Sequence, residues 1–395
     1  MKISSRLYIS FFSLSLIPII ILTVYITISM NAGFNNIADK AGSSFQDISF
    51  NQIKSIRELK SSSVNNYFED RKKLVLTMSQ NGFVVDAMKS FMSSSQKVKD
   101  ELAIPDKDKK VILGKLRNFY EKEFATKYEK LNGKRADVES LMSDIPENDM
   151  LLQALYISEN QHSLGNKDLL YKSEFKCSYT DFHEKFHHYF HEVQKKYGFY
   201  DIFLLDPKDG KIVYSVFKEL DFATSLNKGP YKSSNFADAF KKATQLNNNS
   251  LFMVDYKQYL PSYNAPASFA TAPLYDKGEL IGVLAVQFPL DKLNEIMGQR
   301  DGLKKTGESY LVGPDNLMRS DSYLDPENRN VESSFRNPQS GKVETLAVDE
   351  AFKGQSAEKI IKDYNNNNVL SAFSPIKISD NITWALIVEI DEAEA

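Results

Sequence analysis

The most informative part of the sequence reads Ala267-Ser-Phe-Ala-Thr-Ala-Pro-Leu-Tyr-Asp-Lys-Gly-Glu-Leu-Ile-Gly-Val-Leu-Ala-Val-Gln-Phe288. It indicates the fold because the chain repeats its pattern near the C-terminus. The second copy reads Leu370-Ser-Ala-Phe-Ser-Pro-Ile-Lys-Ile-Ser-Asp-Asn-Ile-Thr-Trp-Ala-Leu-Ile-Val-Glu-Ile390. Each copy is typical of two strands joined by a polar turn, and Pro273 and Pro375 hold the same place. Self-similarity of this kind predicts two domains of one type in tandem.

A second matched pair lies ahead of these copies. Phe203-Leu-Leu-Asp-Pro-Lys-Asp-Gly-Lys-Ile-Val-Tyr-Ser215 precedes the first copy, and Tyr310-Leu-Val-Gly-Pro-Asp-Asn-Leu-Met-Arg-Ser320 precedes the second. Each repeat is therefore predicted to be a small antiparallel sheet with a long loop in its middle. Such a shape suits the holding of a ligand better than a reaction. The predicted fold class is α+β, with a long helix and a helical region ahead of two antiparallel-sheet domains.

The N-terminus is predicted to be a membrane anchor. No residue from Leu7 to Met30 is charged, and as a helix this segment is about 36 Å long, enough for a hydrocarbon core of about 30 Å. We favour a retained anchor over a cleaved signal peptide, whose apolar region is only ~7–15 residues long. Lys2 and Arg6 precede the segment, so residues 1–6 are expected in the cytoplasm and residues 31–395 outside. The chain is expected to be either a complete single-anchor protein or a fragment that ends before a second span.

Composition argues against several classes of function. A length of 395 residues allows about two to three domains. The net charge of −3, with both signs interspersed, argues against nucleic-acid binding. Cys177 is the only cysteine, which excludes a disulfide within the chain. Gly302-Leu-Lys-Lys-Thr-Gly307 has the glycine spacing of a phosphate-binding loop, but Glu308 stands where that motif needs lysine. Because no nucleophile lies in a glycine-flanked elbow either, we expect neither an enzyme nor a cofactor within these residues.

Residues 31–92 are predicted to form one long helix. Apolar residues recur mostly at three- and four-residue steps, and no proline interrupts them. At about 1.5 Å per residue this helix is too long for one compact domain, and its near-heptad spacing favours a stalk that forms a homodimer. The alternative is a bent helix that lies along its own domain. Residues 93–195 are expected to be a more polar helical region with breaks near Pro105, Gly133, Pro146 and Gly165.

The last predicted helix of that region, Thr180 to Tyr197, carries His183, His187 and His191 at four-residue steps. Histidines at this spacing can bind a metal. At ~100° per residue, however, their line flanks an aromatic stripe on its expected solvent side. We therefore favour a solvated face that titrates below neutral pH, and we predict no metal site.

Two clusters of polar and aromatic residues in the first repeat form the candidate binding site. The segment from Phe217 to Tyr231 mixes charges and aromatic rings around a rigid Gly229-Pro230 pair, within a loop too long to be a plain connection. A second cluster extends from Asp255 to Asn264. Fixed polar groups around an apolar pocket are what a small-molecule site requires. The alternative is that both clusters only seal the open face of the sheet. The residues assigned to the site are Lys218, Asp221, Tyr231, Asp255, Tyr256 and Tyr263.

These residues predict the chemistry of the ligand. Lys218 is expected to pair with an anionic group, and Asp221 or Asp255 with an amine or a hydroxyl group. The tyrosines would supply walls with a hydrogen-bonding tip. The expected partner is therefore a small carboxylate or a small amine.

Several motifs resemble those of a known family. The chain is similar to the extracytoplasmic double Cache sensor region of bacterial transmembrane receptors, which has two PAS-like domains on a long stalk helix. This region is found on methyl-accepting chemotaxis proteins, sensor kinases and nucleotide cyclases. The resemblance is weakest over residues 93–180, a helical insertion that simpler members lack. It rests on Ser55-Ile-Arg-Glu-Leu-Lys60 with Tyr67-Phe-Glu-Asp-Arg71, Gly198-Phe-Tyr-Asp-Ile-Phe-Leu-Leu-Asp206, Val213-Tyr-Ser-Val-Phe-Lys-Glu-Leu-Asp-Phe222, Gly229-Pro-Tyr231, and Arg300-Asp-Gly302 with Thr306-Gly-Glu-Ser-Tyr-Leu-Val-Gly313.

The resemblance implies ligand capture by a membrane-distal domain, residues 196–297, and relay through the stalk and a membrane-proximal domain, residues 298–395. It favours a chemotaxis receptor in the cytoplasmic membrane of a bacterium. A histidine kinase, a nucleotide cyclase and an anchored binding protein without its own output are the alternatives. The amino-acid-binding subset of the family carries an Arg-x-Trp-Tyr element, whereas the only tryptophan here is Trp384, expected on the membrane side of the second domain. An amino acid recognised in the usual way is therefore not expected.

Overall fold

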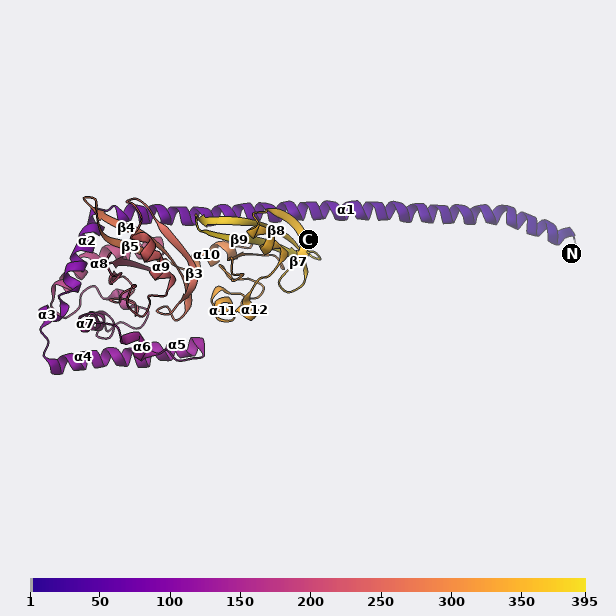
Figure 1. The fold of residues 1–395 in the computed structure, drawn as a ribbon. Coiled ribbons are helices and arrows are strands. Elements are labelled where there is room, and N and C mark those ends of the chain that lie inside the picture. The colour runs from indigo at the N-terminus through magenta and orange to yellow at the C-terminus, as the bar shows by residue number, and fades with distance from the viewer. Residues whose placement is uncertain (1–2) are drawn as a thin grey trace.

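A computed structural model describes residues 3–395 as a long helix that carries two antiparallel sheets along part of its length (Figure 1). Helix α1, Ile3–Ser79, has 77 residues, and its N-terminal half projects well beyond the rest of the chain. By length and composition it is the one helix among the described residues that could cross a membrane. The predicted cytoplasmic segment 1–6 lies partly outside the described residues.

The stalk helix ends earlier than the sequence pattern predicts. The prediction of one helix over residues 31–92 is wrong, because α1 ends at Ser79 and a new helix, α2 (Gly82–Ser95), leaves at an angle. Asn81 has extended backbone, and its side chain accepts a hydrogen bond from the Phe83 amide at 2.8 Å. This is a helix N-cap, which asparagine forms more readily than it continues a helix.

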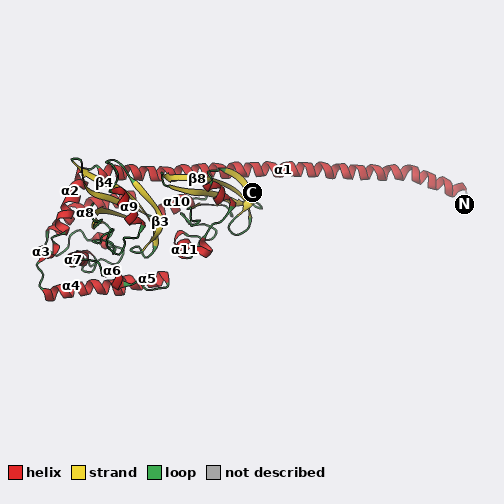
Figure 2. Cartoon of the chain, in the orientation of Figure 1, coloured by secondary structure: helices red, strands yellow, loops and turns green. Residues whose placement is uncertain are grey.

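The helical region that follows α2 packs across the first sheet domain (Figure 2). Its predicted breaks are confirmed, since Pro105 and Pro146 each precede a helix and Gly133 ends one in left-handed backbone. One turn is a π-helix rather than an α-helix. The elements are α3 (Val98–Leu102), α4 (Asp106–Asn118), the π-helix η1 (Phe119–Phe124), α5 (Ala125–Asn132), α6 (Val138–Met142), α7 (Glu147–Tyr156), the 3-10 helix η2 (Lys167–Leu169) and α8 (Ser178–Tyr197).

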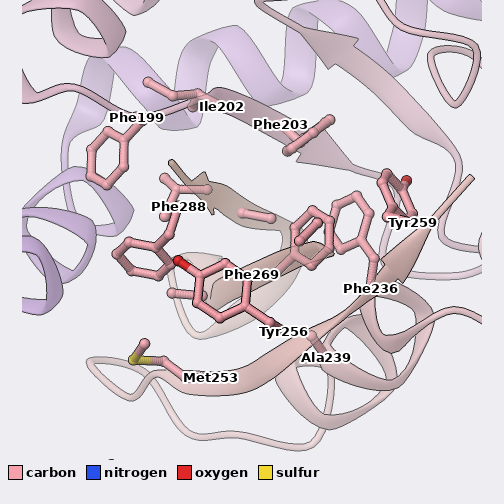
Figure 3. Packing of buried hydrophobic residues seen from close by; sticks show 14 of the residues in the cluster. Phe199, Ile202, Phe203, Phe236, Ala239, Met253, Tyr256, Tyr259, Phe269 and Phe288 are labelled. Atoms are coloured by element: carbon pink, nitrogen blue, oxygen red, sulfur yellow. The ribbon is translucent and has the colours of Figure 1, made fainter. Parts of the chain in front are cut away.

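The first sheet has the strand order β2-β1-β5-β4-β3, and all neighbouring strands are antiparallel. Figure 3 shows its aromatic core, in which Phe236 of the covering helix stacks on Phe269 with ring centroids 4.3 Å apart. Phe203 packs against the same ring of Phe236 at 4.9 Å. The elements are β1 (Asp201–Leu205), β2 (Ile212–Ser215), α9 (Asn235–Ala243), β3 (Phe252–Tyr259), β4 (Ala265–Asp276) and β5 (Glu279–Phe288).

The second sheet has the order β6-β9-β8-β7 and repeats the register of the first. Leu274 pairs with Gly282 across β4 and β5, and Ile376 pairs with Trp384 at the equivalent place across β8 and β9. The tandem repeat and the α+β class are therefore confirmed. The elements are α10 (Asp291–Gly298), β6 (Glu308–Val312), α11 (Val331–Arg336), α12 (Pro338–Gly341), α13 (Leu346–Phe352), β7 (Ala357–Lys362), β8 (Asn368–Ser379) and β9 (Ile382–Asp391).

Helix α1 packs against both sheets. Ile53 lies in a small apolar cluster with Leu370 and Val388 of the second sheet. Further along the helix, the ring of Phe68 contacts Phe288 of the first sheet at 5.4 Å between centroids. A single rigid element therefore touches the cores of both repeats.

Candidate functional site

A cavity of about 420 Å³ lies where three parts of the chain meet. The helical region supplies one wall, the first sheet domain supplies the floor, and α11 of the second domain borders one side. The volume is within the range of small-molecule pockets, about 300–1,000 Å³. Representative lining residues are Phe124, Lys127, Glu219, Tyr263, Gln287 and Arg336.

Glu219 is one of three acidic residues that border this cavity; of the other two, Asp291 is exposed and Glu332 pairs with Arg336. The Glu219 carboxylate accepts hydrogen bonds from the Tyr200 hydroxyl at 2.7 Å and from the Ser262 hydroxyl at 2.8 Å. Burial, followed by the nearby Asp221, raises the pKa of Glu219 to about 8. At neutral pH this carboxyl therefore favours its protonated form, because a second negative charge and poor solvation both oppose ionisation.

Asp221 and Asp201 lie behind Glu219 and are fully buried. Asp221 accepts from the Tyr259 hydroxyl at 2.6 Å, and burial raises its pKa to about 6. Asp201 accepts from three backbone amides, yet burial and then Asp221 raise its pKa to about 8. One oxygen of each carboxyl finds no hydrogen-bond partner within residues 3–395. Buried polar atoms are rarely left unpaired, so the hydrogen bonding of these two carboxyl groups is incomplete.

Lys218 borders the cavity, and its ammonium group contacts other groups of the protein. Its Nζ donates to the Ser215 carbonyl and lies 4.4 Å from the centre of the Tyr214 ring. Burial lowers the pKa of Lys218 to about 7, partly offset by Asp201. The residue adopts left-handed backbone with φ of 59°, which an L-residue rarely does without support from its surroundings.

The structure brings four of the six predicted site residues to this region. Lys218 and Tyr263 line the cavity, and Asp221 and Tyr231 lie in the layer behind it. Tyr231 is buried, and its hydroxyl is unpaired within the described part of the chain. The Tyr263 ring stacks on Phe124 with centroids 4.9 Å apart.

Asp255 and Tyr256 are not at the cavity. The register of β3 shifts between Val254 and Lys257, and this bulge directs Asp255 toward the second domain. There its carboxylate accepts from Nε and Nη2 of Arg319, at 3.0 and 2.9 Å, and from Nε1 of Trp384 at 3.1 Å. Arg319 is only 1% exposed.

Trp384 lies between the two sheets, so its expected place on the membrane side is wrong. Its ring packs against Phe68 of α1 at 5.6 Å and against Tyr256 at 6.0 Å between centroids. At the equivalent place of the first repeat, a side chain on Gly282 would meet Met88 of α2 at 2.5 Å. The two copies therefore share register but pack against different helices.

Sequence reasoning missed the residues that complete the cavity. Glu219 lines the cavity and Tyr259 bonds to Asp221 behind it; both lie within the two clusters that the sequence singled out, but no motif distinguishes either from its neighbours. Phe124 and Lys127 come from the helical region and reach the site only through the tertiary fold. No local pattern indicates such a contact.

The predicted solvated histidine face is also wrong. His183, His187 and His191 are 0, 0 and 3% exposed, and the rings of the first two stack at 4.4 Å. The loop around Asp168 and Tyr171 covers them, and Asp168 Oδ2 lies 2.9 Å from Nε2 of His191. Within the part of the chain that the structure describes, no three side chains are arranged to hold a metal ion.

Solved structures with a similar fold come from bacterial sensors. The ligand-binding domain of the Pseudomonas fluorescens chemoreceptor CtaA in complex with L-isoleucine matches with 10% identity and a TM-score of 0.42, over 89% of this chain and 96% of that one. The periplasmic sensory domain of the Campylobacter jejuni chemoreceptor Tlp1 matches with 13% identity and a TM-score of 0.35, over 83% and 97%. The sensor domain of the V. cholerae histidine kinase DctB matches with 10% identity and a TM-score of 0.37, over 60% and 87%.

The family itself is shown by sequence. A comparison with curated proteins gives no match. The family model described as Cache domain, in contrast, matches residues 32–395, which include both sheets, the helical region and most of α1. The chain therefore belongs to the Cache domain family of sensor domains.

Proposed function

We propose that this protein senses a small molecule with a protonated amine, which binds in the cavity beside Glu219. The observation that carries the proposal is the acidic layer: Glu219 borders the cavity, and Asp201 and Asp221 behind it each keep an unpaired carboxyl oxygen. The cations that border the cavity already contact other groups of the protein. Nζ of Lys218 faces the Tyr214 ring, and Nζ of Lys127 lies over the Tyr263 ring. Nζ of Lys167 donates to the Asn160 carbonyl, and Arg336 pairs with Glu332. A cation that donates hydrogen bonds satisfies this site better than a carboxylate does.

The amine proposal predicts proton release on binding. Because the pKa of Glu219 is raised to about 8, its carboxyl holds a proton at pH 7 before a ligand binds. A bound ammonium group favours the ionised carboxylate, so affinity should rise as the pH increases toward 8. Calorimetry in phosphate and in Tris should then give different observed enthalpies, as expected for released protons. Equal enthalpies and a flat affinity between pH 6 and 8 would argue against this chemistry.

Residues 31–395 should be titrated with n-butylammonium, butyrate and succinate, which separate charge from carbon skeleton. We expect binding of the amine alone, weakened about tenfold or more by Glu219→Gln, because a charge-assisted hydrogen bond is lost. Glu279→Gln, on an exposed strand end, is the matched control. Tighter binding of butyrate would show that the amine assignment is wrong. An affinity unchanged by Lys218→Ala with Tyr231→Ala would show that the site is wrong.

We further propose that the chain is anchored in a bacterial membrane by the apolar part of α1 and relays ligand binding through the second domain. Strand β3 supports this route, because Tyr259 bonds to Asp221 behind the cavity while Asp255 bonds to Arg319 of the second domain. The ligand would bias a two-state arrangement of the domains. A chemotaxis output is favoured over a kinase or a cyclase. A second apolar span and a long coiled coil encoded after residue 395 would support chemotaxis, whereas a nucleotide-binding domain would support an enzyme.

A homodimer through the stalk is the proposed assembly. Phe45, Ile48 and Leu59 are 64, 61 and 68% exposed along α1, an apolar stripe that a second stalk could cover. In a Cys177→Ser background, Ile48→Cys should form a disulfide-linked dimer in membranes under mild oxidation. Lys54→Cys, on a flank of the same helix, should not. Equal cross-linking at both positions would argue against this face.

A further inference from the structure

We infer that the helical region is part of the binding site, and that its Gln153, oriented by Tyr120, is the positioning residue for the cavity-lining segment 218–222. This inference rests on the proposed function, because it assigns a role within the same cavity. It goes beyond that proposal in placing a determinant of the site on α7, outside both sheet domains.

The Gln153 side chain is fully buried, and both ends of its amide form hydrogen bonds. Its Nε2 donates to the carbonyl oxygens of Leu220 and Phe222, at 3.0 and 2.6 Å. Its Oε1 accepts from the Tyr120 hydroxyl at 2.9 Å, so this hydroxyl fixes which end of the amide faces the segment. A buried amide is tolerated only when it is hydrogen-bonded, and here every bond leads to the cavity segment or to the π-helix.

The segment that Gln153 holds needs such support. Lys218 at its start and Ala223 directly after its end have φ of 59° and 61°, a left-handed conformation that is unfavourable for residues other than glycine. Glu219 and Leu220 between them line the cavity. The two hydrogen bonds from Gln153 hold the segment between these strained positions, and so fix where Glu219 stands.

The helical region also forms hydrogen bonds with a second strained segment at the cavity. Tyr263 and Asn264, at the turn between β3 and β4, also have left-handed backbone, with φ of 58° and 61°. Asn132 of α5 donates to the Tyr263 carbonyl at 3.0 Å, and Asn264 donates to the Tyr128 hydroxyl at 2.6 Å. The helical region thus anchors both left-handed segments that border the cavity.

The π-helix joins this anchoring to the cavity wall. Phe119 and Phe124 line the cavity, while Tyr120 in the same six-residue turn bonds to Gln153. A π-helix is a costly variant that recurs at functional sites. Any ligand that packs against these phenylalanines therefore touches the turn that orients the positioning residue.

Tyr120→Phe tests the inference, with Tyr179→Phe as a matched control. Both tyrosines are fully buried and donate one hydrogen bond at 2.9 Å, but the Tyr179 hydroxyl donates to Val213 in β2 and not to Gln153. The Tyr179 ring contacts Phe222 of the segment at 6.4 Å between centroids, and Tyr179→Phe keeps that ring contact. We expect similar small losses in unfolding midpoint. Only Tyr120→Phe should speed amide hydrogen exchange over residues 218–224 and weaken n-butylammonium binding, each by about fivefold, as for one lost hydrogen bond.

Gln153→Leu, which removes the donor but keeps the volume, should give larger changes in the same two measurements. Equal effects of Tyr120→Phe and Tyr179→Phe, or no effect of Tyr120→Phe on exchange and binding, would overturn the inference. Wild-type protein that binds none of the three probes would instead contradict the proposed ligand class. In that case faster exchange over residues 218–224 in Tyr120→Phe would still support the positioning role, and unchanged exchange would overturn it.

Discussion

At the scale of single residues, Asp255 shows how one carboxylate joins two domains. It accepts three hydrogen bonds across the domain boundary, two from Arg319 and one from Trp384. The guanidinium is enclosed so tightly that a side chain on Gly313 would meet its Cζ at 2.1 Å. Burial opposes the charge on Arg319, but Asp255 and Asp315 keep its pKa above the ordinary value. The pair therefore depends on both partners being present.

Asp255→Ala should destabilise the protein by about 3 kcal/mol, because it leaves a buried guanidinium without its main counter-charge. Asp315→Ala is the control, since Asp315 pairs with the same guanidinium but is 43% exposed, and it should cost less than about 1 kcal/mol. Urea unfolding measures the loss in the free energy of unfolding for both variants. The double variant Asp255→Ala with Arg319→Met should recover part of the loss, and no recovery would contradict this account.

At the scale of elements, α8 gives the protein a response to acid. Burial, followed by the nearby Lys218, holds the pKa of His183 and of His187 well below the ordinary value. The unfolded chain therefore binds protons at these two groups more readily than the folded chain does. The stability they contribute is present above about pH 6.5 and is lost as the pH falls below it.

The free energy of unfolding should fall by up to about 1.4 kcal/mol per histidine for each pH unit below about 6.5. His183→Gln should reduce this acid dependence, and His162→Gln, on an exposed loop, should not. Urea unfolding at pH 7.5, 6.5 and 5.5 measures the difference between each variant and the wild type. A difference for His183→Gln that does not change with pH would show that this histidine is not held neutral by burial.

At the scale of the whole molecule, each sheet buries acidic groups of its own. In the second domain, Glu389 of β9 stands opposite Glu308 of β6 in the sheet register. Glu389 accepts from the hydroxyls of Tyr310 and Ser371, each at 2.9 Å, and burial raises its pKa to about 8. The raised pKa means that the folded state holds this proton more tightly than the unfolded chain does.

Glu389 changes the free energy of unfolding with pH in the direction opposite to that of the histidines. Its contribution is fully present below the unfolded pKa of 4.5 and is lost as the pH rises through about 8. Glu389→Gln should therefore remove a decline of about 1.4 kcal/mol per pH unit over that window. Urea unfolding of the variant and of the wild type at pH 6, 7, 8 and 9 measures it, with Glu392→Gln as the exposed control. Parallel curves for Glu389→Gln and the wild type would contradict a raised pKa.

The repeat, its register and the class of fold follow from local sequence patterns. Pro273 and Pro375 mark equivalent strands, and Gly282 and Trp384 occupy equivalent places in the two sheets. Strand alternation and turn residues are local properties, so a repeated pattern gives a repeated element. The apolar N-terminal segment and the family resemblance could be predicted from the sequence because they too are local patterns.

Which side chains meet depends instead on how the elements pack. A one-residue bulge in β3 sends Asp255 to Arg319 rather than to the cavity, and a loop covers the His187 face that local periodicity places in solvent. Gln153 reaches Leu220 across 67 positions of sequence. Such contacts depend on how whole elements pack, which a local pattern does not encode. The fold of this protein is therefore predictable from local periodicity, whereas its cavity is formed by the packing of the helical region on the first sheet.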